Sequence, residues 1–244
     1  MRGWIHGVWL MALPFCAPSA IAVQAASGVT AVSGTPATSP EEDFEAANKA
    51  DKSGDMVTAG SLYRRAADGG HAEAQARVGH ILYRGSDNER ALEYFRKSAA
   101  QDNANGQFGV AFMYQRGEGG VQQDMAEAHK WYALAAQQGQ IPSIHTLAEA
   151  CMGYSEATLS KDFDRVKTEN EKKMLDAAML CGPDQLFWIK RAADIDFVPA
   201  VTSLANAYRS GQYGLAVDLQ QADALDAKAN KLLGIVEKVK KKKR

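Results

Sequence analysis

Five histidines and three cysteines are the side chains of this 244-residue sequence best suited to metal binding or nucleophilic catalysis. None of them lies in an H-E-x-x-H or C-x-x-C motif. His145 and Glu149 are spaced to share one face of a helix, but a metal site needs three or four ligands. The S-x-x-K and K-T-G motifs of serine acyl-enzymes are absent, since Lys167-Thr168-Glu169 lacks the glycine. The sequence therefore predicts a protein that is not an enzyme, with no catalytic residue, no cofactor and no metal.

The composition is that of an ordinary globular protein. Apolar residues make up 46% of the chain and charged residues 23%, and 28 Lys+Arg nearly balance 29 Asp+Glu. A dedicated nucleic-acid-binding protein usually has a clear basic excess, so no nucleic-acid partner is expected.

The N-terminus has the layout of a secretory signal peptide over residues 1–22. Arg2 precedes an apolar run at residues 8–17, and Ala20-Ile21-Ala22 supplies a cleavage signal. An uncleaved membrane anchor is the alternative, but about 20 apolar residues are needed to cross a bilayer. Pro14 and Phe15 stand where a lipoprotein signal has small residues, which excludes lipidation of Cys16. We expect an exported protein with no membrane span after processing.

The next segment, residues 23–38, is rich in small and hydroxyl residues and predicts a disordered linker. The folded region begins at Ser39, because Ser39, Pro40 and Glu42 are typical of the first turn of a helix. No Asn-x-Ser/Thr site occurs, so a bacterial periplasmic protein is the simplest interpretation, with secretion as the alternative. A helical repeat domain is expected over residues 39–239.

Internal repetition is the strongest pattern in the sequence. Pairs of small residues recur, and a new helix is expected five residues after each pair, at Ala72, Ala104, Ile141 and Val198. Gly85, Gly117 and Gly211 are expected to end helices in the left-handed conformation. One helical hairpin cannot bury its apolar face alone, so the repetition predicts stacked hairpins rather than an irregular helical bundle.

The unit at residues 104–140 resembles a Sel-one-like repeat, a relative of the tetratricopeptide repeat, and the resemblance covers roughly residues 55–234. It implies an all-α, right-handed α-solenoid of stacked antiparallel helix pairs that binds other macromolecules and usually has no catalytic activity. The residues that match the repeat pattern are Tyr114, Gly117, Asp124, Ala128, Trp131, Tyr132, Ala135, Ala136 and Gly139, with Tyr208, Gly211 and Asp218 in the unit from Val198.

The units differ in length, because their starts are 32, 37 and 57 residues apart. The unit from Ala72 has lost five residues between its helices, whereas the unit from Ile141 carries an insertion near residues 155–181 that includes an expected extra helix. Cys151 and Cys181 bracket this insertion and are predicted to form a disulfide; two buried free thiols are the alternative. The insertion is either a partner-specific element or a surface decoration.

Side chains that the repeat leaves variable, on the first helix of each unit, are candidates for contact with a partner protein. In stacked helix pairs this helix usually lines the concave side, and aromatic and arginine residues are effective anchors. The alternative for the two phenylalanines is packing in the core. The candidates are His80, Arg84, Phe108, Phe112, Arg116, His145 and Glu149.

The C-terminal helix is expected to carry an apolar stripe from Leu219 to Val239, and the chain ends in a basic tail. This tail is either solvated or in weak contact with an anionic surface, and the rest of the exported chain is acidic. Its residues are Lys240, Lys241, Lys242, Lys243 and Arg244.

Together these features predict a non-catalytic exported adaptor or scaffold for protein–protein interactions in the bacterial cell envelope. The first alternative is a periplasmic hydrolase or β-lactam-binding protein of the same repeat family. The second is a secreted factor that contacts a host.

Overall fold

The computed structural model describes residues 38–153, 172, 176–177 and 179–235. The chain divides into two compact units, Met1–Ala37 and Thr38–Arg244, and all described residues lie in the second. The predicted signal peptide, the predicted linker up to Ala37, most of the insertion and the basic tail lie outside the described residues.

Every regular element in the described part of the chain is helical, and none of these helices is both long and apolar enough to cross a membrane. The elements are α1 (Pro40–Lys52), α2 (Met56–Asp68), α3 (Ala72–Arg84), α4 (Asn88–Ala99), α5 (Ala104–Arg116), α6 (Met125–Gln137), α7 (Ile141–Gly153), α9 (Gln185–Asp194), α10 (Val198–Ser210), the 3₁₀ turn η2 (Gln212–Gly214) and α11 (Leu219–Leu232).

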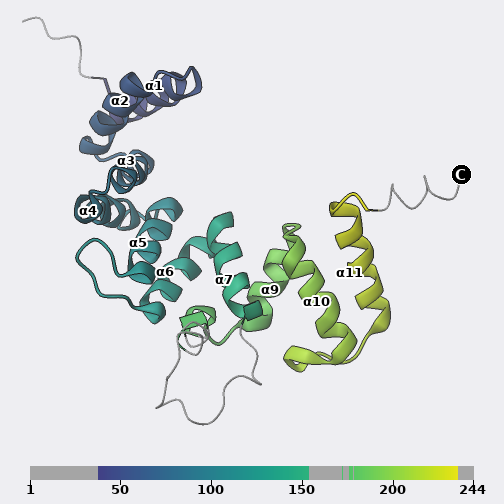
Figure 1. Ribbon diagram of the computed structural model, residues 1–244. Coiled ribbons are helices and arrows are strands. Elements are labelled where there is room, and N and C mark those ends of the chain that lie inside the picture. Colours follow the sequence, from purple (N-terminus) through teal and green to yellow (C-terminus); the bar gives the residue numbers. More distant parts are fainter. Residues whose placement is uncertain (1–37, 154–171, 173–175, 178, 236–244) are drawn as a thin grey trace, which may run out of the picture. The chain divides into compact units, whose positions relative to one another are not determined.

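Each helix packs against its neighbour along the chain, as Figure 1 shows. The hairpins are α1–α2, α3–α4, α5–α6, α7–α9 and α10–α11, and the second helix of each hairpin contacts the first helix of the next. First helices of consecutive hairpins also meet, in the contacts α3–α5 and α7–α10. The predicted all-α solenoid of stacked helix pairs is confirmed.

The predicted helix starts at Ala72, Ala104, Ile141 and Val198 are confirmed. At the start of α1, the Glu42 N–H donates to Ser39 Oγ at 3.1 Å, and the Ser39 N–H donates to the Glu42 carboxylate at 2.7 Å. This reciprocal pair satisfies two N–H groups that the first helical turn would otherwise leave without partners.

In every hairpin except α7–α9, the turn is closed by an aspartate N-cap whose backbone N–H donates to a carbonyl of the preceding helix. The Asp124 N–H donates to the Tyr114 carbonyl at 2.9 Å, and the Asp218 N–H donates to the Tyr208 carbonyl at 2.9 Å. In the shortened unit the Asp87 N–H still donates to the equivalent carbonyl at 3.0 Å. The deletion therefore shortens the loop between α3 and α4 but keeps the backbone hydrogen bond that joins the Asp87 N-cap to the preceding helix.

The expectation of left-handed glycine caps is correct at two positions and wrong at the third. Gly117 and Gly211 have φ of 67° and 73°, but Gly85 has φ of −83°. In the short turn Ser86 takes the left-handed conformation instead, with φ of 64°. The chain must reach the Asp87 N-cap two residues after Gly85, so the reversal falls one residue later.

Small residues and one ring form the junction between the second and third hairpins. The Phe95 side chain is only 1% exposed and lies against the backbones of Gly79 and Gly109, where a Cβ atom would clash with its ring. Ala111 and Ala148, which stand at the position of Gly79 in the next two hairpins, are fully buried. Close approach of neighbouring backbones is the physical reason for small residues at these positions.

The apolar stripe expected along the C-terminal helix is only partly present. Helix α11 ends at Leu232, followed by Gly234 with φ of 68°, and residues 236–239 lie outside the described residues. Ala222 and Ala229 are buried, but the Leu219 side chain is 59% exposed. Leu225 packs half-buried against the core, whereas Leu219 and Leu232 at the two ends of α11 are exposed.

Candidate binding surface

Aromatic side chains and one arginine meet where α3 and α5 lie side by side; we call Tyr83, Phe108, Phe112 and Arg116 the α3–α5 surface. The Phe112 ring lies edge-on to Tyr83, with ring centroids 5.3 Å apart. The Arg116 guanidinium lies 5.4 Å from the Phe112 ring centroid, and the Phe108 and Phe112 rings are 6.4 Å apart. All three rings are half-buried and Arg116 is exposed, so one edge of the cluster is open to a partner.

Arg116 is held in place from two sides. Its Nε donates to the Glu118 carboxylate at 2.7 Å, just beyond the end of α5. Loss of solvent contact is the main reason that the pKa of Tyr83 is raised, while the charge of Arg116 opposes that rise. Arg116, Phe112 and Tyr83 therefore form one group, and the contacts within it already restrict the rotamers of these side chains.

Two predicted contact residues lie on the inner side of this group. The His80 ring packs edge-on against the buried Phe95, with centroids 4.9 Å apart, and burial lowers the pKa of His80. Phe108 packs against the buried Tyr132 ring at 5.6 Å. His80 and Phe108 thus support the surface from the core, while Phe112 and Arg116 present it.

The remaining predicted contact residues are not brought into this group. Arg84 is exposed at the end of α3, and Glu149 is exposed on α7. His145 stacks on Phe197, the residue before α10, with ring centroids 4.1 Å apart and planes at 19°. The pattern in the sequence missed Tyr83, Glu118 and Phe197; the spacing of three residues between His80 and Tyr83 is a signal that places both on one helix face.

The repeat-pattern residues occupy the junctions between helices. Ala128, Tyr132, Ala135 and Ala136 are buried, and the Tyr132 hydroxyl donates to the Gln115 side chain at 2.7 Å. Trp131 is half-buried, and its Nε1–H donates to Glu127 at 3.0 Å. Gly139 follows α6 with φ of 85°.

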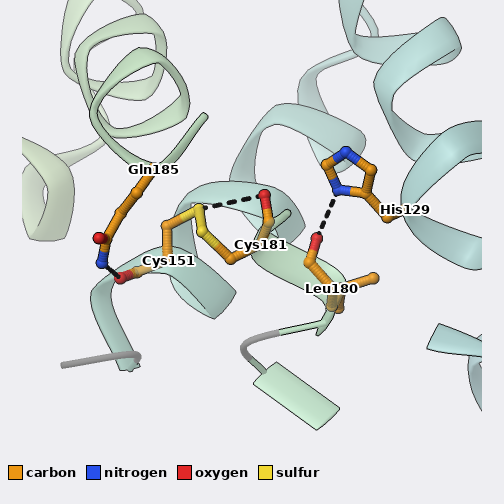
Figure 2. Close-up of a disulfide and its surroundings, with 5 residues drawn as sticks. All are labelled: His129, Cys151, Leu180, Cys181 and Gln185. Atoms are coloured by element: carbon orange, nitrogen blue, oxygen red, sulfur yellow. Dashed lines mark hydrogen bonds between the residues drawn. A yellow bond between two sulfur atoms is a disulfide. The ribbon is translucent and has the colours of Figure 1, made fainter. Parts of the chain in front are cut away.

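Cys151 and Cys181 form a disulfide, in agreement with the pairing expected from the sequence (Figure 2). Their Cα atoms are 4.7 Å apart, and both residues are fully buried. The Gln185 side chain donates to the Cys151 carbonyl at 2.6 Å, and His129 Nδ1 lies 2.7 Å from the Leu180 carbonyl oxygen. The bridge holds residues 180–182 against α6, and neither sulfur is a free thiolate for a Cys–His nucleophile.

Each described histidine takes part in helix capping, ring packing or a hydrogen bond within the fold. His71 caps α3, because its Nδ1 accepts from the Ala74 N–H at 3.1 Å, and its Nε2 lies 3.0 Å from the Glu41 carboxylate. His80, His129 and His145 make the packing and hydrogen-bond contacts given above. Within residues 38–153 and 179–235, no group of three or more His, Cys, Asp or Glu side chains is arranged to hold a metal ion.

A family model described as the Sel1 repeat matches three consecutive segments, residues 51–71, 72–103 and 104–140. The uncharacterised protein NMB1327 of Neisseria meningitidis serogroup B is 29% identical over 169 residues, which are 62% of this chain and 34% of that protein. DAP3-binding cell death enhancer 1 of Rattus norvegicus is 34% identical over 85 residues, 34% of this chain and 16% of that protein.

Two solved structures are similar to this chain. A protective antigen present in uropathogenic Escherichia coli strains, which displays an SLR fold, has a TM-score of 0.53 at 28% identity over 78% of this chain and 38% of that one. A Sel1 repeat protein from Oxalobacter formigenes has a TM-score of 0.55 at 26% identity over 79% of this chain and 52% of that one. This chain thus spans about half or less of each of these proteins. Residues 51–140 thus carry three consecutive Sel1 repeats, and the described helices have the same solenoid fold as these two structures.

Proposed function

We propose that this chain is a non-catalytic adaptor that holds a partner protein against the α3–α5 surface. Sel1 repeats generally mediate protein–protein interactions. The observation that carries the proposal is the group of half-buried Tyr83 and Phe112 with exposed Arg116, which is shared by two consecutive repeats. Aromatic and arginine side chains dominate the binding energy of protein interfaces, and side chains already held in place lose less entropy on binding.

The partner is a protein that presents a carboxylate and an apolar side chain at one spot. The exposed Arg116 guanidinium, whose Nε is paired with Glu118, can also donate to a partner's carboxylate through its terminal nitrogens, and the Phe112 ring beside it offers apolar area. DAP3-binding cell death enhancer 1, which shares sequence with this chain, is named for binding another protein, and this supports a protein ligand.

We further propose that the adaptor acts outside the cytoplasm, in the bacterial cell envelope. The buried Cys151–Cys181 disulfide supports this location, because such bridges persist in oxidising compartments. The signal-like residues 1–22 support it independently. Cell fractionation with thiol alkylation tests the location: the processed chain should be recovered in the periplasmic or secreted fraction without alkylatable thiols, and a full-length cytoplasmic chain with two alkylated cysteines besides Cys16 would refute it.

Photo-crosslinking in the native cell tests the proposed binding function. A photoreactive phenylalanine analogue at position 112 should trap one protein, whereas the same analogue at Phe187, a 52% exposed position on α9, should not trap it. Phe112 is half-buried and Phe187 is more exposed, so trapping at position 112 alone would come from the α3–α5 surface and not from exposure. Equal trapping at both positions would refute the assignment of the binding surface.

A further inference from the structure

An open apolar groove lies between α2 and α3. It has a volume of about 310 Å³, and its lining includes an 86% exposed Val57 and a 45% exposed Ile81. This groove is separate from the α3–α5 surface, which uses other residues of α3. The lining residues are Val57, Gly60, Ser61, Arg64, Val78 and Ile81.

The equivalent place on α4 is covered by the loop of the following hairpin. Gly119, with φ of 72°, lies so close to α4 that a Cβ atom there would be 2.7 Å from the Asn88 carbonyl oxygen and 3.0 Å from Leu92. The Asn88 side chain donates to Glu118 at 3.2 Å, and Val121 packs against the buried cluster that contains Leu92. A short turn with left-handed Gly119 and Gly120, followed by Val121, thus fills this position.

The equivalent place on α6 is covered as well, by residues 180–182. His129 stands at the position that corresponds to Leu92, and its ring contacts the Leu180 carbonyl oxygen and the Gly182 backbone. The Cys151–Cys181 disulfide holds this segment in place. Two consecutive hairpins therefore use a piece of chain with a left-handed glycine to cover the second helix of the hairpin before them.

On α2 both parts of this arrangement are missing. The turn that would cover it, between α3 and α4, is the one that is five residues shorter than its counterpart. Gly60 stands where Leu92 and His129 stand on α4 and α6, and a Cβ atom at Gly60 would meet no other atom within 4 Å. The groove therefore exists because α2 lacks both the covering segment and the side chain that lies under that segment in α4 and α6.

We propose that a short turn of a partner protein fills this groove, with two small residues, then a β-branched apolar residue, then a carboxylate. The first three features are those of the segment that fills the equivalent place on α4. The carboxylate follows from Arg64, which is exposed at the groove and makes no hydrogen bond or ion pair with the residues the structure describes. Its neighbour Arg65 is paired with Asp43, so only Arg64 offers a free guanidinium at this place on α2.

Methyl NMR of the isotope-labelled chain, titrated with the acetylated peptide Ser-Gly-Gly-Val-Glu amide, tests this proposal. The methyl signals of Val57, Val78 and Ile81 should shift in a saturable manner. Replacement of the peptide's glutamate by glutamine should weaken binding to the wild-type chain, and this difference should disappear in Arg64→Gln. No shift, or equal binding of the two peptides by the wild-type chain, would overturn the proposal.

The variant Gly60→Leu fills the groove from below and should weaken peptide binding by at least about tenfold. The variant does not weaken binding by unfolding, because leucine favours a helix more than glycine and the space is empty, so its Tm should equal or exceed that of the wild type. Ala46→Leu, which adds the same side chain at an exposed site on α1, is the matched control and should bind like the wild type. Unchanged peptide binding by Gly60→Leu would overturn the proposal. A wild-type dimer seen by sedimentation that this variant abolishes would overturn it as well, because a second copy of the chain would then fill the groove.

Discussion

Phe112 of α5 and Tyr83 of α3 meet edge to face, with ring centroids 5.3 Å apart and ring planes at 89°. The contact joins the first helices of two consecutive Sel1 repeats. Edge-to-face pairs of this kind stabilise by about 0.5–1.5 kcal/mol beyond the area they bury. The two rings therefore couple the packing of the solenoid to the orientation of the side chains that it exposes.

Removal of the disulfide should destabilise the fold substantially. Cys151 and Cys181 are 30 residues apart, and closing a loop of this length stabilises by about 3–4 kcal/mol in the chain-entropy model. Cys151→Ala/Cys181→Ala should therefore unfold at a lower urea concentration than the wild type. Reductant should shift the wild-type midpoint in the same direction and leave the double variant unchanged. An effect of reductant on the double variant would show that the shift has another source.

Phe95→Ala should be the most damaging single substitution in the first three hairpins. Its ring fills the space against the Gly79 and Gly109 backbones, and truncating a buried phenylalanine costs about 3–5 kcal/mol. Denaturant unfolding followed by circular dichroism measures the loss. Phe187→Ala removes a ring that is 52% exposed and should change stability by about 0.5 kcal/mol or less. Similar losses in the two variants would contradict the assigned core.

Asp43 should make the first hairpin sensitive to acid. Hydrogen bonds from Arg65, and then from Thr38, lower its pKa from 3.8 to about 2. Because the folded pKa is below the unfolded one, this stabilisation is complete above about pH 4 and is lost as the pH falls through 2. Urea midpoints measured between pH 5 and 2 should fall less steeply in Asp43→Asn than in the wild type. Glu45→Gln, an exposed carboxylate on the same helix, should keep the wild-type slope.

The order of the helices could be predicted from the sequence because the repeat fixes it locally. Small-residue pairs and N-cap aspartates specify where helices end and begin, and the starts at Ala72 and Ala104 follow from that spacing. The cysteine pairing was predictable for a similar reason, since Cys151 and Cys181 flank the one long departure from the period.

The surface was predictable only in part. The sequence indicates which positions vary, but the partners of each side chain depend on how far neighbouring helices rotate against each other. The Tyr83 ring contacts Phe112 of another helix, and the Phe197 ring, which follows the insertion in the chain, stacks on His145. Neither contact has a fixed sequence spacing, so no periodic pattern reveals it.

The conformation of Gly85 shows the same limit at the level of the backbone. Its place in the repeat matches Gly117, but the turn that follows is shorter, and Ser86 adopts the positive φ instead. The length of the loop decides which residue adopts the left-handed conformation. A glycine at the aligned position does not decide it. The same missing residues leave Gly60 uncovered, which makes loop length the strongest sequence signal for the groove on α2.

The most direct test of the proposed binding function is titration calorimetry with the protein that crosslinks at position 112. Phe112→Ala/Arg116→Ala should lower its affinity by about 2 kcal/mol or more, which is roughly thirtyfold, while helical content and Tm stay near wild-type values. Phe187→Ala, and Gly60→Leu on the separate groove, should keep wild-type affinity. Full affinity in the double variant would contradict the conclusion that the α3–α5 surface binds the partner.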